Sequence, residues 1–140
     1  MPEKAAFENF AHDADIGVRG RGGTLAEALA NTGRALTAVV TDPASIREVL
    51  SVEIACEAAH PEELLFDWLN ALVFEMATRR VLFARYEVKV EGARLVARAF
   101  GEPVDVARHQ PAVEVKGATW TALRVGREGG GWVAECVVDV

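Results

Sequence analysis

A change of hydrophobic period along the chain most constrains its fold, because two helical stretches interrupt a sequence that otherwise alternates. The first helical stretch begins after Thr24, which forms a T-x-x-E capping box with Glu27, and Pro43 blocks its continuation. The second begins at Pro61, a residue suited to the first turn of a helix, and ends on a pair of arginines. Apolar residues recur at helical spacing within both. The pattern therefore predicts two helices, the second covered on more than one side.

Alternating apolar and polar residues predict strands in the remaining stretches. Residues 47–58 alternate, with Val52, Ile54 and Cys56 on one side and Glu53 and Glu57 on the other. Residues 85–102 form two alternating runs joined by a turn at Gly92. We expect a further long strand over residues 113–125 and a last strand that runs to the C-terminus. The order predicts an α+β fold, with two helices packed on a mostly antiparallel sheet in a single domain over residues 1–140.

The charge of the chain argues against direct, tight binding of RNA. It has 15 basic and 21 acidic residues, a net charge of −6, and its basic residues are scattered. A nucleic-acid-binding protein would carry a basic patch to neutralise phosphates. A protein partner or a cation suits this charge better.

Apolar runs and cysteines indicate a cytoplasmic protein without a membrane partner. No run approaches the ~18 apolar residues of a membrane span, and the first ten residues lack the apolar core of a signal peptide. Cys56 and Cys136 are isolated and lack the spacing of a zinc site. Both fall at apolar positions, so we expect buried free thiols.

Common catalytic motifs are missing from the sequence. It contains no GxSxG, HExxH, GxxxxGK(S/T) or GxGxxG, and its histidines are scattered. A hydrolase therefore has little support from the sequence. A small metal-dependent hydrolase is the weakest of the alternatives, since no nucleophile or base is evident.

Carboxylates at the two ends of the chain are the most informative polar residues. In the stretch HDADIGVRG, Asp13 and Asp15 share a face if the segment is extended. At the other end, Asp139 interrupts an apolar strand one residue before the terminal carboxylate of Val140. If the two strand ends are neighbours, these oxygens repel one another unless a hard cation such as Ca²⁺ or Mg²⁺ lies among them. The sequence alone leaves open whether they are neighbours or are separately solvated.

A second group of polar residues lies in the segment 101–117. Glu102, Asp105, His109 and Glu114 are typical of a solvated loop. Lys116 stands on the side of its predicted strand opposite Val113 and Val115. It either extends to solvent or faces the acidic residues.

The chain resembles the archease family. The resemblance rests on HDADIGVRGRGGTLAEALANTGRAL, EELLFDWLNALVFE, GEPVDVARHQPAVEVKGATW and the terminal VVDV, which occur in the family's order over almost the whole chain. It implies the archease fold and a non-enzymatic activator of the RtcB-type RNA ligase of tRNA splicing. Such activators promote guanylylation of the ligase with GTP and let it turn over repeatedly, so tRNA is contacted only through the ligase.

The resemblance also implies a divalent-metal site near the two chain ends. Its ligands would be Asp15, Asp139 and Val140, with Ca²⁺ as the first candidate and Mg²⁺ or Mn²⁺ as others. Lys116 would take part in activating the ligase, together with Asp15 and Asp139. His12 and Asp13 are candidates for additional ligands.

Three positions depart from the family pattern, and one alternative function stays open. Asp13, Val113 and Thr121 stand where the family usually has threonine, threonine and histidine, and none of these changes removes an oxygen ligand. The family fold resembles the chaperone Hsp33, so the alternative is a chaperone-like or scaffold protein. That reading predicts an exposed apolar patch and activity without metal. The oligomeric state is left open.

Overall fold

The computed structural model describes residues 4–140 of the chain. Its elements, in chain order, are β1 (Phe7–His12), β2 (Asp15–Gly22), α1 (Leu25–Val40), the 3-10 turn η1 (Pro43–Ser45), β3 (Leu50–Glu57), α2 (Pro61–Arg79), β4 (Val81–Glu91), β5 (Arg94–Pro103), α3 (Val106–His109), β6 (Gly117–Ala118), β7 (Arg124–Glu128) and β8 (Gly131–Asp139).

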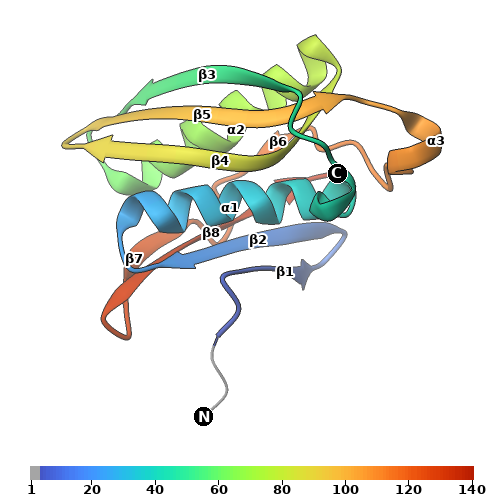
Figure 1. The fold of residues 1–140 in the computed structure, drawn as a ribbon. Helices are drawn as coiled ribbons and strands as arrows, with labels where there is room; N and C mark the ends of the chain where they lie inside the picture. The colour runs from blue at the N-terminus through green and yellow to red at the C-terminus, as the bar shows by residue number, and fades with distance from the viewer. Residues whose placement is uncertain (1–3) are drawn as a thin grey trace.

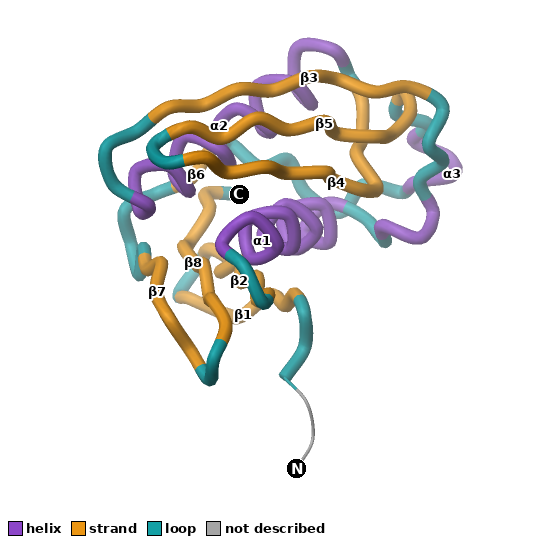
Figure 2. The backbone as a smooth tube through the Cα atoms, turned by 60° about the vertical axis from the view of Figure 1, so that its left-hand side comes forward, coloured by secondary structure: helices purple, strands orange, loops and turns teal. Residues whose placement is uncertain are grey.

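Two antiparallel sheets enclose the two long helices. One sheet has the order β1-β2-β8-β6, with β7 also paired to β8, and the other has the order β3-β5-β4. Helix α1 packs on β2 on one side and on β4 on the other, and α2 also contacts both sheets (Figure 1). Figure 2 shows α1 almost end-on between the two sheets. The α+β class is confirmed, and the predicted strands are divided between two sheets.

Helix α1 begins and ends where its local sequence predicts. The Thr24 hydroxyl accepts a hydrogen bond from the Glu27 amide at 3.1 Å, and the Glu27 carboxylate accepts one from the Gly23 amide at 2.7 Å. The helix stops at Val40, three residues before Pro43. The capping signals are therefore confirmed in detail.

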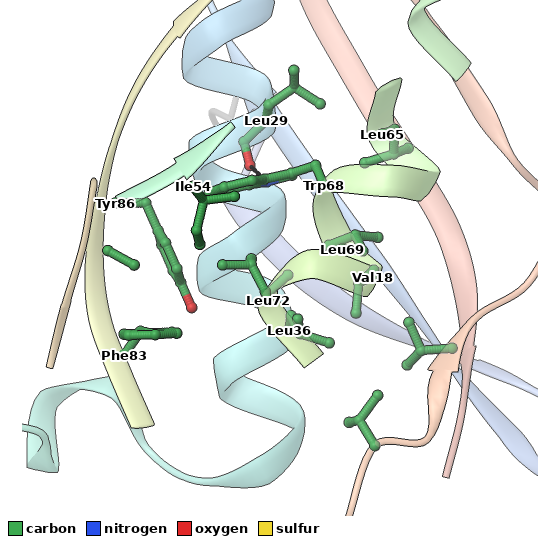
Figure 3. Packing of buried hydrophobic residues seen from close by; sticks show 14 of the residues in the cluster. Val18, Leu29, Leu36, Ile54, Leu65, Trp68, Leu69, Leu72, Phe83 and Tyr86 are labelled. Carbon is green, nitrogen blue, oxygen red and sulfur yellow. Dashed lines mark hydrogen bonds between the residues drawn. The ribbon is translucent and has the colours of Figure 1, made fainter. Parts of the chain in front are cut away.

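Aromatic residues join the helices to the three-stranded sheet in the core. Trp68 of α2 is fully buried, and its indole N–H donates to the Leu29 carbonyl of α1 at 2.9 Å. Tyr86 of β4 lies edge-on to Trp68, and its hydroxyl lies 2.7 Å from the hydroxyl of Thr37. Figure 3 shows both rings among the buried leucines of the two helices. Burial raises the pKa of Tyr86, so this hydroxyl stays protonated and able to donate.

The predicted long strand over residues 113–125 is wrong. Only Gly117–Ala118 and Arg124–Glu128 are strands there. Hydrogen bonds to α1, β8 and α2 prevent the segment from following one sheet edge. The Ala112 amide donates to the Val40 carbonyl, and the Lys116 amide donates to the Asp139 carbonyl. The Ala118 amide donates to the side-chain oxygen of Asn70. A left-handed residue, Ala122 (φ 54°), then turns the chain into β7.

The free cysteines differ in their burial. Cys136 of β8 is fully buried, and burial raises the pKa of its thiol to about 12. Cys56 of β3 is half-buried, so the prediction of a buried thiol is confirmed fully for Cys136 alone. Among the helices of residues 4–140, none is long and apolar enough to cross a membrane.

Candidate functional site

The start of β2 and the end of β8 meet at one end of the five-stranded sheet. The two strands are antiparallel, with Ile16 opposite Val138, and one further step in this register places Asp15 opposite Asp139. Directly opposed residues of such a pair have their Cβ atoms about 4.5–5.5 Å apart. The sequence left open whether the two strand ends are neighbours, and the pairing of β2 with β8 shows that they are.

Strand β6 brings Lys116 to the same end. Gly117 pairs with Asp139, and the Lys116 amide donates to the Asp139 carbonyl at 2.9 Å. The Lys116 side chain is exposed and the preceding Val115 is buried, as the predicted alternation requires. We call Asp15, Lys116, Asp139 and Val140 the acidic end of the sheet.

Asp13 does not share the environment of Asp15. It lies in the two-residue turn between β1 and β2, where its φ of 51° is left-handed, and its side chain is 95% exposed. The segment is therefore not extended at Asp13, and the condition under which both aspartates would share a face is not met. The partner of Asp15 across β1 is instead His12, whose Nδ1 lies 3.8 Å from an Asp13 oxygen.

Side chains on the outer face of this sheet follow in rows. In the row next to the acidic end, the Phe10 ring covers Gly17, where an added Cβ would lie 2.1 Å from the ring. In the row beyond, Arg19 lies between Glu8 and Glu135, at 2.9 and 3.1 Å. Because Arg19 forms ion pairs with these two glutamates, its charge does not neutralise the carboxylates of the acidic end.

The donor set of the acidic end consists of oxygens. Asp15 and Val140 are half-buried and Asp139 is exposed. Within residues 4–140, Asp15 and Asp139 form no ion pair, and nowhere in that range do three His, Cys, Asp or Glu side chains gather to hold a metal ion. The sequence-based prediction adds the main-chain carboxylate of Val140 as a third acidic group. Such oxygen donors fit a hard cation such as Ca²⁺ and do not suit zinc.

A buried charge cluster, which the sequence did not indicate, lies in the segment expected to be a solvated loop. Glu102 and His109 are buried, and His109 belongs to α3. The Glu102 carboxylate accepts from Arg108 at 2.5 Å and from the Arg47 amide at 2.6 Å, and it lies 3.1 Å from His109 Nε2. Nδ1 of His109 accepts from the Asp105 amide at 2.8 Å, so the ring proton is on Nε2 and is donated to Glu102.

Arg108 has the largest effect on the cluster's carboxylate. With the Arg47 amide and His109, it holds the pKa of Glu102 at about 2, against an ordinary value of 4.5. Arg108 also donates to the Ser45 carbonyl at 2.7 Å. The cluster therefore ties α3 to β5 and η1, and the enclosed His109 ring serves as a structural link. Glu102 and Arg47 are 55 residues apart, and Glu102 and His109 lie on a strand and on a separate short helix, so no sequence period could have revealed the cluster.

Comparison with known proteins places this architecture in one family. The sequence profile of the Archease protein family (MTH1598/TM1083) matches residues 7–140. The protein archease of Methanopyrus kandleri is 37% identical over 138 residues, which cover 96% of this chain and 99% of that protein. The protein archease of Pyrococcus furiosus is 32% identical over 139 residues, which cover 96% and 98%. The chain belongs to the archease family.

Solved structures support the same fold. The solution structure of protein 1598 from Methanobacterium thermoautotrophicum matches with a TM-score of 0.86 at 28% identity, covering 96% of this chain and 99% of that one. An archease from Thermotoga maritima, described as a possible chaperone, matches with a TM-score of 0.63 at 20% identity, covering 100% and 98%. At that identity the second match shows the fold alone.

Proposed function

We propose that this protein is a non-enzymatic, cytoplasmic activator of an RtcB-type RNA ligase in tRNA splicing, and that it acts through the acidic end of its sheet. Membership of the archease family supports the proposal. The observation that carries it is the register that brings Asp15 opposite Asp139, beside Lys116. Among residues 4–140, Lys116 contacts Asp139 through main-chain atoms, and no basic side chain forms an ion pair with either carboxylate. Their mutual repulsion is therefore uncompensated, which suits a purely structural role poorly.

We further propose that Asp15, Asp139 and the Val140 carboxylate hold a divalent cation, most readily Ca²⁺. Ca²⁺ takes six to eight oxygens, so a bound ion would retain open positions for a phosphate or a carboxylate of the ligase. The chain's own part is to hold the acidic oxygens on two strands that are hydrogen-bonded to each other. Lys116 adds an exposed positive charge that stabilises the nucleotide phosphates during guanylylation.

Multiple-turnover ligation by the cognate ligase tests the role. We expect acceleration by the wild-type protein and loss of at least about tenfold of it in Asp139→Ala, as for removal of a group that acts directly at the site. Glu91→Ala, which removes an exposed carboxylate at the β4–β5 turn, is the matched control and should accelerate ligation fully. Equal acceleration by all three proteins would place the active surface elsewhere, and no acceleration by any would remove the proposal.

Thermal unfolding tests the cation separately from the ligase. A ligand at 100 times its Kd stabilises the folded state by about 2.7 kcal/mol, which raises the unfolding temperature by roughly 5–10 °C in a domain of this size. Ca²⁺ should give such a rise with the wild type and with Glu91→Ala, but not with Asp139→Ala. An equal rise with Asp139→Ala would show that the ion binds elsewhere.

A chaperone-like role is the second candidate, and exposed aromatic residues favour it. The side chains of Phe74 and Trp120 are 62% and 60% exposed. A general chaperone should suppress aggregation of an unfolding client protein equally well in Ca²⁺ and in EDTA. Ligase activation should require the cation and be lost in EDTA. Comparing each activity in Ca²⁺ and in EDTA therefore distinguishes the two candidate functions.

A further inference from the structure

The outer side of α2 carries an aromatic surface that the acidic end does not use. Phe66, Asn70 and Phe74 are four residues apart, so they follow one another along one side of the helix. Trp120, from the segment before β7, stacks on Phe66 with ring centroids 4.5 Å apart and an interplanar angle of 14°. Asn70 fixes the same segment by accepting from the Ala118 amide at 2.9 Å. Two of the exposed large apolar side chains, Phe74 and Trp120, are thus held on one side of the molecule.

An apolar cavity of about 210 Å³ lies beside this side of α2. Val73 and Ala77 of α2 form one wall, and Pro111 and Val113 of the segment after α3 form the other. The cavity has room for one large aliphatic side chain, since a packed Leu or Met occupies a comparable volume. We call Phe66, Phe74, Trp120 and this cavity the α2 surface.

Acidic side chains lie around the α2 surface, and Lys116 is the exposed basic residue of the neighbouring segment 111–120. Glu63 and Asp67 on the exposed side of α2, and Glu114 at the rim of the cavity, form no ion pair within the part of the chain that the structure describes. Arg79, in the last turn of α2, is already paired with Glu75. An incoming segment with basic side chains would therefore find free carboxylates next to the aromatic rings.

Spacing along α2 indicates the shape of the occupant. Phe66, which carries Trp120, and Phe74 are eight residues apart, which corresponds to about 12 Å along the helix axis. Apolar residues at positions i and i+7 or i+8 of a partner helix span about the same distance. We propose that the α2 surface binds an amphipathic helix of a protein partner, with apolar anchors two turns apart and Lys or Arg beside them.

This inference goes beyond the activator proposal and does not rest on it. It concerns Phe66, Phe74, Trp120 and the cavity beside them, none of which belongs to the acidic end, and its test contains neither ligase nor cation. A failure of ligase activation would not contradict the α2-surface proposal. A failure of peptide binding would not contradict the proposal for the acidic end.

Binding of a labelled model peptide, measured by fluorescence anisotropy, is the test. The probe is a synthetic helical peptide of about 18 residues with leucine on one face and arginine on the other, compared with the same peptide carrying glutamate in place of arginine. We expect the basic peptide to bind and the acidic one not to bind. Phe74→Ala with Trp120→Ala should weaken binding at least about tenfold, as for loss of aromatic anchors.

Matched controls come from exposed apolar residues elsewhere. Val49→Ala with Val106→Ala removes two side chains that are 67% and 71% exposed, and should leave binding unchanged. Should Trp120→Ala disturb folding, Phe74→Ala alone still removes an aromatic ring that is 62% exposed. Glu63→Gln with Asp67→Asn should weaken binding through charge.

Four results would overturn the assignment. They are equal affinity for both peptides, no binding of either, binding that the α2 variants leave unchanged, and a concentration-dependent dimer that Phe74→Ala dissociates. The last of these, seen by sedimentation velocity, would identify a second copy of this chain as the occupant.

Discussion

Aspartates two positions apart in the chain have different surroundings because one turn separates them. Asp13 has a left-handed φ and is in solvent, whereas Asp15 begins β2 and faces the end of β8. Asp13 adopts this conformation because Asn and Asp tolerate it better than other side chains, which also suits a two-residue hairpin. The departure from the family's threonine therefore falls on the turn and adds no carboxylate to the row of Asp15 and Asp139.

Replacing Glu102 with glutamine should remove an acid-sensitive contribution to stability. The pKa of Glu102 is about 2 in the folded protein and 4.5 ordinarily, so its ionised form stabilises the fold above about pH 4.5. That contribution is lost as the pH falls from 4.5 towards 2. Chemical denaturation at several pH values should therefore show Glu102→Gln less stable than wild type at pH 7, with the difference shrinking towards pH 2.

The same measurement on Glu91→Gln provides the control. Glu91 is exposed at a hairpin end, so its variant should follow the wild type at every pH. If the free energies of unfolding of Glu102→Gln and the wild type differ by the same amount from pH 7 to pH 2, the ionised form of Glu102 does not stabilise the fold.

At the scale of elements, the helices are where the sequence is most informative. Thr24, Glu27 and Pro61 act on their own neighbours in the chain, so their effects are visible without the fold. The segment 113–125 behaves differently, because Val40, Asn70 and Asp139 decide its path from distant parts of the chain. The alternating pattern therefore predicted one long strand, whereas long-range hydrogen bonds divide the segment into the short strands β6 and β7.

The contact between β2 and α1 depends on the absence of a side chain at Gly20. A Cβ there would lie 2.3 Å from the Thr32 nitrogen and 2.4 Å from the Ala28 oxygen, both main-chain atoms of the helix. Gly20→Ala should therefore destabilise the protein by about 1–3 kcal/mol or more, since the backbone must shift. Gly126→Ala in β7 is the matched control, because nothing lies within 4 Å of its added Cβ. Equal unfolding midpoints in urea for the two variants would contradict this packing.

At the scale of the whole molecule, the fold joins the two ends of the sequence. Residues 15 and 139 are nearly the full chain apart, and only the pairing of β2 with β8 places them together (Figure 1). The sequence showed that these carboxylates are chemically suitable, and the resemblance to archeases suggested their pairing. The register is a property of the assembled sheet, so local patterns could not have shown it.

A double-mutant cycle at Asp15 and Asp139 tests the central claim most directly, with multiple-turnover ligation as the readout. If the two carboxylates form one site, Asp15→Asn and Asp139→Asn should each reduce ligase activation about tenfold or more. The double variant should then activate the ligase as well as the less active of the two single variants. Thermal unfolding of each variant in EDTA confirms that the fold is retained. Losses that multiply in the double variant, or full activation by either single variant, would show that the acidic end is not one functional site.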